Sequence, residues 1–147
     1  MNFVPLSTIV TGHEERVLVC LMTELIADIL IVDDMPDNLK VLTAMLNKEG
    51  YKVRSVLSGD MALTAARAAA PDLILLDVNM PVMDGYEVCE ALKADPGLTH
   101  IPVIFITALG EELDKPRAQQ VGAADSILKP YRIDEVLEKI AYHLRIT

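Results

Sequence analysis

The stretch ILIVDDMPDN, residues 29–38, begins as a run of branched apolar residues and ends in a cluster of acids. Its apolar part is typical of a strand that is buried on both faces, as in a parallel sheet. Asp33 and Asp34 follow directly, at the place where such a strand would leave the sheet. The fold therefore depends on whether similar runs recur, and the function on what adjacent acids do at a strand end.

Four more apolar runs follow, and amphipathic or alanine-rich segments separate them. The predicted strands cover residues 29–32, 51–57, 72–76, 103–107 and 126–128. The predicted helices cover residues 38–49, 58–70 with Ser58 as the cap, and 86–94, followed by a short helix that begins near Pro116 and a last helix from about residue 133. Five β–α units in succession predict a flavodoxin-like, doubly wound α/β fold, with one parallel sheet in the strand order 2-1-3-4-5 and helices on both faces.

Composition narrows the class of protein. A chain of 147 residues with 52% hydrophobic residues has room for one well-packed domain. The formal net charge of −9 argues against a nucleic-acid surface, which needs clustered lysine and arginine. Cys20 and Cys89 form no C-x-x-C pair and are interpreted as reduced cysteines. With no signal peptide or apolar span in the sequence, we expect a soluble, cytoplasmic protein that neither crosses a membrane nor binds nucleic acid.

Residues 1–27 are interpreted as an N-terminal extension and residues 28–147 as the α/β domain. A capping box at residues 11–14 precedes an apolar helical stripe made by Val17, Leu18, Leu21, Met22 and Leu25. This pattern predicts a helix over residues 13–26. Such a stripe needs a partner surface, so we expect it to pack on the outside of the domain or on a second copy, which makes a homodimer a candidate. The alternative is a passive, extended tail.

The strand order predicts where the acids meet. In the order 2-1-3-4-5 the direction of winding reverses between the first and third strands, and ligands bind beyond their carboxyl ends. Asp33 and Asp34 end the first of these strands, and Asp77 ends the third. Carboxylates brought so close raise one another's pKa unless a cation neutralises them. Mg²⁺ fits, because it binds oxygen ligands and needs few carboxylates.

The remaining strand ends add chemistry to these acids. An aspartate after a strand is common in turns and caps, so the acidic pair alone does not establish a site. Thr107 ends the fourth strand and Lys129 the fifth, which adds a hydroxyl and an ammonium at the same edge. This set suits phosphoryl transfer, with Asp77 as nucleophile and a metal and fixed cation to neutralise the phosphoryl oxygens. We expect Asp33 and Asp34 to hold the metal, and Lys129 and Thr107 to contact the phosphoryl group.

Four stretches together resemble the receiver domain of two-component response regulators, from residue 28 to about residue 144: ILIVDDMPDN, PDLILLDVNMPVMDGYEV, IPVIFITA and GAADSILKPY. The resemblance implies a signalling domain rather than an enzyme, phosphorylated on Asp77 by a sensor histidine kinase or a histidine phosphotransfer protein. It implies Mg²⁺ bound by Asp34, by Asp77, by the backbone carbonyl of Asn79 and by Asp33 through water. It also implies a cis peptide between Lys129 and Pro130, and roles for Thr107 and Lys129 as the switch hydroxyl and the site lysine.

One position departs from the family pattern. Receivers usually carry an aromatic residue three positions before the lysine, and here that position holds Ser126. The resemblance then predicts intact phosphorylation with a smaller than usual movement of the last strand and its flanking helices. Tyr131 is a partial substitute at a different place, and Leu109 is expected to help shield the phosphate. Residues 36–42 and 93–109 look most like receivers attached to hybrid histidine kinases or cyclic-dinucleotide enzymes.

Three other functions fit the sequence less well. A haloacid-dehalogenase-type phosphatase needs a second aspartate two residues after the nucleophile, where this chain has Asn79. A flavodoxin-like FMN carrier should present serine, threonine and glycine amides to the phosphate in its first loop, whereas DDMPDN would repel it. A degenerate receiver that acts only as a docking module would have lost one of the site residues, and none is missing here. The histidines show no ligand or triad spacing.

Overall fold

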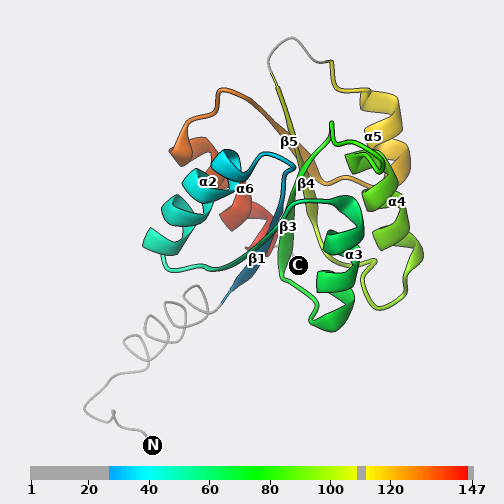
Figure 1. Ribbon diagram of the computed structural model, residues 1–147, viewed down its shortest axis with the longest axis horizontal. Helices are drawn as coiled ribbons and strands as arrows, with labels where there is room; N and C mark the ends of the chain where they lie inside the picture. Colours follow the sequence, from blue (N-terminus) through cyan, green and yellow to red (C-terminus); the bar gives the residue numbers. More distant parts are fainter. Residues whose placement is uncertain (1–26, 109–111, 146–147) are drawn as a thin grey trace, which may run out of the picture.

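The computed structural model describes residues 27–108 and 112–145. Strands and helices alternate along these residues (Figure 1). The strands are β1 (Asp28–Val32), β2 (Lys52–Val56), β3 (Leu73–Asp77), β4 (Val103–Thr107) and β5 (Asp125–Leu128). The helices are α2 (Pro36–Lys48), α3 (Gly59–Ala68), α4 (Gly85–Ala94), α5 (Lys115–Val121) and α6 (Ile133–Arg145).

The five strands form one parallel sheet in the order β2-β1-β3-β4-β5. Helices α2 and α6 cover one face of the sheet, and α3, α4 and α5 cover the other (Figure 1). Side chains alternate between the two layers, so that Leu30 and Val32 pack on the α3–α4 side and Ile29 and Ile31 on the α2–α6 side. The predicted flavodoxin-like architecture is confirmed.

Short polar motifs set the ends of the helices. Ser58 caps α3 as predicted, because its Oγ accepts a hydrogen bond of 3.2 Å from the Met61 amide. Asp84 and Glu87 form a reciprocal capping box at the start of α4. Gly122 ends α5 with a left-handed backbone at φ 89°, a conformation that glycine adopts without strain. These motifs hold the helices in place around the carboxyl edge of the sheet.

Some predicted bounds shift by a few residues. Helix α2 begins at Pro36, two residues before the predicted start, because a proline in the first turn loses no intrahelical hydrogen bond. Strand β3 runs on to Asp77, which makes the expected nucleophile part of the sheet itself. The peptide between Lys129 and Pro130 is cis, as the resemblance implied.

Several predictions concern residues that the structure does not describe. The expected helix over residues 13–26, the shielding role of Leu109 and the state of Cys20 all lie outside the described residues. Cys89 is a free, buried thiol whose pKa burial raises to about 11. Among the described helices, none combines the length and the apolar character that crossing a bilayer requires.

Candidate functional site

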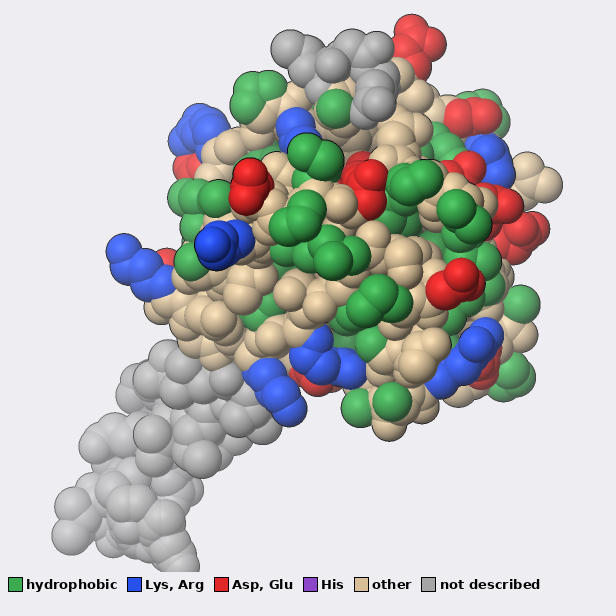
Figure 2. Space-filling view, viewed as in Figure 1, with side chains coloured by type: hydrophobic (Ala, Val, Ile, Leu, Met, Phe, Trp, Pro, Cys, Tyr) green, Lys and Arg blue, Asp and Glu red, His purple; other side chains and the backbone are tan. Residues whose placement is uncertain are grey.

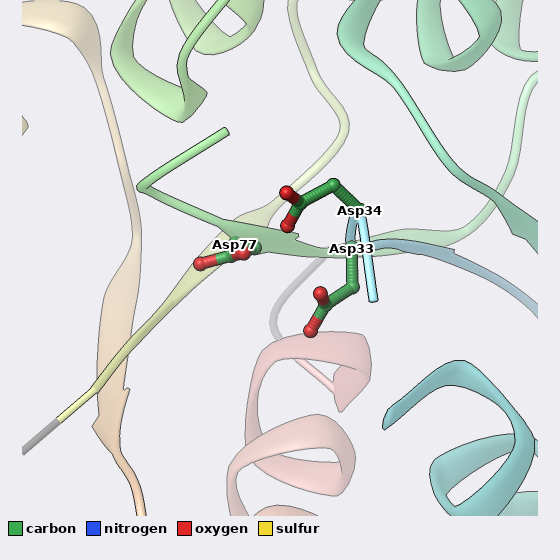
Figure 3. A group of neighbouring side chains, drawn as sticks. All are labelled: Asp33, Asp34 and Asp77. Carbon is green, nitrogen blue, oxygen red and sulfur yellow. The ribbon is translucent and has the colours of Figure 1, made fainter. Parts of the chain in front are cut away.

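Three aspartates meet at the carboxyl edge of the sheet, between its two central strands. Val32 pairs with Leu76 in the β1–β3 ladder, so that Asp33 and Asp77 are the next residues on neighbouring strands. Asp33, Asp34 and Asp77 each have a carboxylate oxygen within 4.8 Å of the others (Figure 3). Asp33 and Asp77 are buried and Asp34 is partly exposed. The predicted convergence of these residues is therefore present.

Asp33 is held by donors from three parts of the chain. Its Oδ1 accepts a hydrogen bond of 2.9 Å from the Met35 amide. Its Oδ2 accepts one of 3.2 Å from the Asn38 side-chain amide and a charge-assisted one of 3.3 Å from Lys129 Nζ. Because three hydrogen bonds, one of them charge-assisted, act on both of its oxygens, the Asp33 carboxylate has a defined orientation in the site.

Asp77 has a different electrostatic environment. Burial, together with the nearby negative charge of Asp33 and of Asp34, raises the pKa of Asp77 to about 7. Lys129 and a 3.3 Å hydrogen bond from the Asn79 amide to Asp77 Oδ1 act in the opposite direction and only partly offset this rise in pKa. A bound cation would favour the ionised form, so the carboxylate is poised to respond to one.

The ends of β4 and β5 lie beside the acids. Asp77 pairs with Ile106, which places Thr107 one residue further along the neighbouring strand. Thr107 is buried, and its carbonyl accepts a 2.7 Å hydrogen bond from the Lys129 amide. The Lys129 side chain is 24% exposed and reaches back across the sheet edge to Asp33. The hydroxyl and the ammonium thus belong to the same edge as the three carboxylates.

The donor set suits a hard divalent cation. Three carboxylates offer oxygen ligands within a small space, and like charges at that spacing repel one another unless a cation lies between them. Oxygen-only ligands with two or three carboxylates are what Mg²⁺ usually binds, with waters completing its coordination. Asp33, Asp34 and Asp77 could therefore hold Mg²⁺.

The comparison with known families decides the class of this domain. The family described as response regulator receiver domain matches residues 29–141. The chain belongs to the response regulator receiver family. The matched residues include the three aspartates of the site and the ends of β4 and β5, and they contain every strand residue except Asp28 at the start of β1.

Similar proteins agree with this receiver assignment. The response regulator PleD of Caulobacter vibrioides is 47% identical over 111 residues, which are 76% of this chain and only 24% of PleD. The signal receiver domain of a signal transduction histidine kinase from Syntrophus aciditrophicus is 38% identical, with a TM-score of 0.75 over 81% of this chain and 90% of that one. The receiver domain of the sensor histidine kinase PA1611 of Pseudomonas aeruginosa, described with a magnesium ion coordinated in its active site cleft, is 32% identical, with a TM-score of 0.74 over 80% and 97%.

Two features of this receiver site were not predicted from the sequence. Asn38 donates to Asp33, and its only sequence signal was an amide side chain in the first turn of the helix that follows the acids. Tyr86 links the start of α4 to the cap of α5, because its hydroxyl accepts a 2.9 Å hydrogen bond from the Asp114 backbone amide. The Tyr86–Asp114 contact joins residues 28 apart through tertiary packing, whereas Asn38 lies only five residues after Asp33 and its contact depends on the geometry of the turn between β1 and α2.

Ser126, which stands where receivers usually carry an aromatic residue, lies near an aromatic side chain of the neighbouring strand. Ser126 lies in β5 opposite Phe105 of β4 and is partly exposed. Phe105 is fully buried on the α3–α4 side of the sheet, where its ring meets that of Tyr86 edge-on at 5.3 Å. Tyr131 packs on the opposite side, against the α2–α6 layer. The aromatic rings of Phe105 and Tyr86 thus lie on one side of the sheet, and that of Tyr131 lies on the other.

Proposed function

We propose that Asp77 accepts a phosphoryl group from a phosphohistidine donor, in a reaction that depends on Mg²⁺, and that the modified domain then changes its binding to a partner. The observation that carries this proposal is the buried Asp77 carboxylate beside two further carboxylates and within the field of Lys129. No simple structural role needs this set of charges at one sheet edge, because buried charges of like sign destabilise a fold.

The reaction would form an acyl phosphate on Asp77. An oxygen of the ionised carboxylate attacks phosphorus, the bond between phosphorus and the donor's imidazole nitrogen breaks, and the electron pair of that bond stays on the imidazole. Bound Mg²⁺ would supply neutralisation of the phosphoryl oxygens, held by Asp33, Asp34 and Asp77 and by the backbone carbonyl of Asn79. Without a cation the pKa of Asp77 is about 7, so bound Mg²⁺ would also favour the ionised carboxylate that attacks phosphorus.

Lys129 and Thr107 would contact the phosphoryl group once it is attached. Lys129 is bonded to Asp33, so we infer that its ammonium turns from Asp33 Oδ2 to a phosphoryl oxygen as charge builds up on Asp77. Thr107 would donate its hydroxyl to a second oxygen. Thr107 is the last residue of β4, and α5 is the next helix along the chain, so a movement of Thr107 toward the phosphoryl group would be expected to reach α5 and change partner binding.

An apolar rim supports a protein as the phosphoryl donor. Four of the large hydrophobic side chains that are exposed belong to segments following β1, β2 and β3 at this edge: Met35, Leu57, Met61 and Val82. On the face shown in Figure 2, hydrophobic and acidic side chains are interspersed. Val82 is 98% exposed and has a φ of 70°, which is strained for a β-branched residue. These surfaces fit a sensor histidine kinase or histidine phosphotransfer protein that covers the site.

The test is phosphorylation of purified protein with a small phosphoryl donor and Mg²⁺. Incubation with acetyl phosphate should give a hydroxylamine-sensitive phosphate on wild-type protein, visible as a mass increase in intact mass spectrometry. Asp77→Asn should abolish it, because an amide cannot form the acyl phosphate. Asp60→Asn, which removes an exposed carboxylate from α3, is the matched control and should be labelled like wild type.

Two outcomes would contradict the proposal. Labelling of Asp77→Asn at the wild-type level would show that another residue is the acceptor. A wild-type protein that is not labelled by acetyl phosphate, and that does not bind beryllofluoride in the presence of Mg²⁺, would instead be a docking module without phosphoryl chemistry.

A further inference from the structure

Asn38 and Lys129 share one oxygen of Asp33. The Asn38 amide lies 3.2 Å from Asp33 Oδ2, and the Lys129 ammonium lies 3.3 Å from the same atom. They come from opposite ends of the domain's sequence, since Asn38 is in the first turn of α2 and Lys129 follows β5. We propose that Asn38 is a positioning residue that holds Asp33 in place when Lys129 leaves it, an inference that rests on the phosphorylation proposed above.

The acceptor capacity of Asp33 explains why two donors matter. A carboxylate has about four lone-pair sites, two on each oxygen. Met35 uses one site on Oδ1, while Asn38 and Lys129 together use both sites on Oδ2. When the ammonium turns to the phosphoryl group, Oδ2 gains one free site for a metal-bound water and keeps one donor, the Asn38 amide. Asp33 can then change partners without losing its orientation.

The two donors differ in a way that suits these roles. The Lys129 ammonium sits on a long, flexible side chain and carries a charge that a phosphoryl group attracts. The Asn38 side-chain amide is neutral and sits on a short side chain. The backbone that carries it is fixed at the start of α2, because the Asn38 backbone N–H donates to the Met35 carbonyl at 3.1 Å. The negative charge of a phosphoryl group would therefore not draw the Asn38 side chain away from Asp33. It is partly buried, which limits replacement of its hydrogen bond by water.

Two donors on one oxygen predict how strongly Mg²⁺ affinity should change when each donor is removed. Side chains that orient a metal ligand typically change metal affinity by about 10–100-fold when removed. With Lys129 in place on Oδ2, Asn38→Ala should weaken Mg²⁺ binding by only about two- to threefold, since one donor remains. In a Lys129→Met background the same substitution removes the last donor on Oδ2, and Mg²⁺ binding should weaken by about tenfold or more.

The experiment is a double-mutant cycle on the full chain. Mg²⁺ affinity would be measured by isothermal titration calorimetry at pH 8 for wild type, Asn38→Ala, Lys129→Met and the double variant. Asn47→Ala, which removes an exposed asparagine from the same helix, is the matched control and should leave the affinity unchanged in both backgrounds. Urea unfolding of each variant separates loss of stability from loss of positioning, and Asn38→Ser provides a second substitution at the site.

A second readout follows the phosphorylated state directly. Beryllofluoride would stand in for the phosphoryl group, and ¹⁹F NMR would give the Mg²⁺ concentration needed to form half of the complex. In that complex Lys129 should contact a fluorine atom and leave Asn38 as the remaining donor to Asp33 Oδ2. Asn38→Ala should therefore raise this Mg²⁺ concentration by about tenfold even with Lys129 present.

The outcomes separate this inference from the proposed function. If Asn38→Ala changes Mg²⁺ affinity by the same factor with and without Lys129, and has no larger effect on the beryllofluoride complex, the positioning role is wrong while phosphorylation stands. An Asn47→Ala effect equal to that of Asn38→Ala would also overturn it. A wild-type protein that forms no beryllofluoride complex would overturn both proposals.

Discussion

Asp33 and Asp77 are buried next to each other at the carboxyl edge of the sheet, and different contacts hold them. Asp33 accepts three hydrogen bonds, from Met35, Asn38 and Lys129. Asp77 accepts one from the Asn79 amide, and burial with nearby negative charge raises its pKa to about 7. For Asp77, burial and like charge outweigh the single hydrogen bond and the attraction of Lys129, and its ionisation is disfavoured.

The raised pKa of Asp77 predicts a pH-dependent cost in stability. The folded protein binds this proton more tightly than the unfolded chain, so stability is lost as pH rises from about 3.8 to about 7. The side chain of Asp77→Asn does not ionise, so it avoids the cost of a buried negative charge at high pH. In Mg²⁺-free buffer at pH 8, the unfolding free energy of Asp77→Asn should be about 2–4 kcal/mol larger than that of wild type. Below pH 4 the difference should nearly vanish.

Urea unfolding of both proteins with EDTA, from pH 4 to pH 8, measures this difference. Added Mg²⁺ should stabilise wild type and not Asp77→Asn, because a ligand that binds only the folded protein raises its unfolding free energy. A constant difference between the two proteins across the whole pH range would show that Asp77 does not titrate as described.

At the scale of elements, one tyrosine ties the loop before α5 to the start of α4. The Tyr86 hydroxyl accepts a 2.9 Å hydrogen bond from the Asp114 amide, and the Arg117 guanidinium lies over the ring at 4.4 Å. Arg117 also lies 3.9 Å from Asp84. These contacts anchor α5 on α4.

Tyr86→Phe tests this connection with a minimal change. The ring and its 5.3 Å edge contact with Phe105 are kept, while the Asp114 amide loses its acceptor. We expect the unfolding free energy to fall by about 0.5–1.5 kcal/mol, and amide hydrogen exchange to become faster across residues 114–118. Tyr142→Phe, at an exposed tyrosine of α6, is the control and should change neither. Unchanged exchange in Tyr86→Phe would show that the hydroxyl does not anchor α5.

At the scale of the whole molecule, the described part of the chain already contains a five-stranded sheet covered on both faces. The five-stranded sheet and its two apolar layers are formed by residues from Ala27 onward, and the family match begins at residue 29. We therefore propose that residues 28–147 are the receiver domain and residues 1–27 an extension. Deleting residues 2–21 should leave acetyl phosphate labelling of Asp77 at the full-length level, while any self-association seen by light scattering should decrease.

The 147-residue chain, labelled and measured under the same conditions, is the control for the deletion. If the shortened protein is folded by circular dichroism but no longer labelled, the segment belongs to the working domain and this division of the chain is wrong.

Fold class and strand order followed from the sequence because they depend on local and repetitive features. Buried parallel strands are apolar throughout, and the alternation of such runs with helical segments leaves few topologies. The meeting of Asp33 and Asp77 followed as well, because the carboxyl ends of neighbouring parallel strands lie at one edge. Even the cap at Ser58 was predictable, since it involves residues three apart.

Only the tertiary structure decided which donors hold each side chain. The contacts of Asn38 and Lys129 with one oxygen of Asp33, and of Asp114 with Tyr86, join segments from different elements. Such contacts depend on the packing and rotamers of whole layers, which no periodic pattern encodes. The raised pKa of Asp77 belongs to the same class, because it arises from burial and from charges brought together by folding.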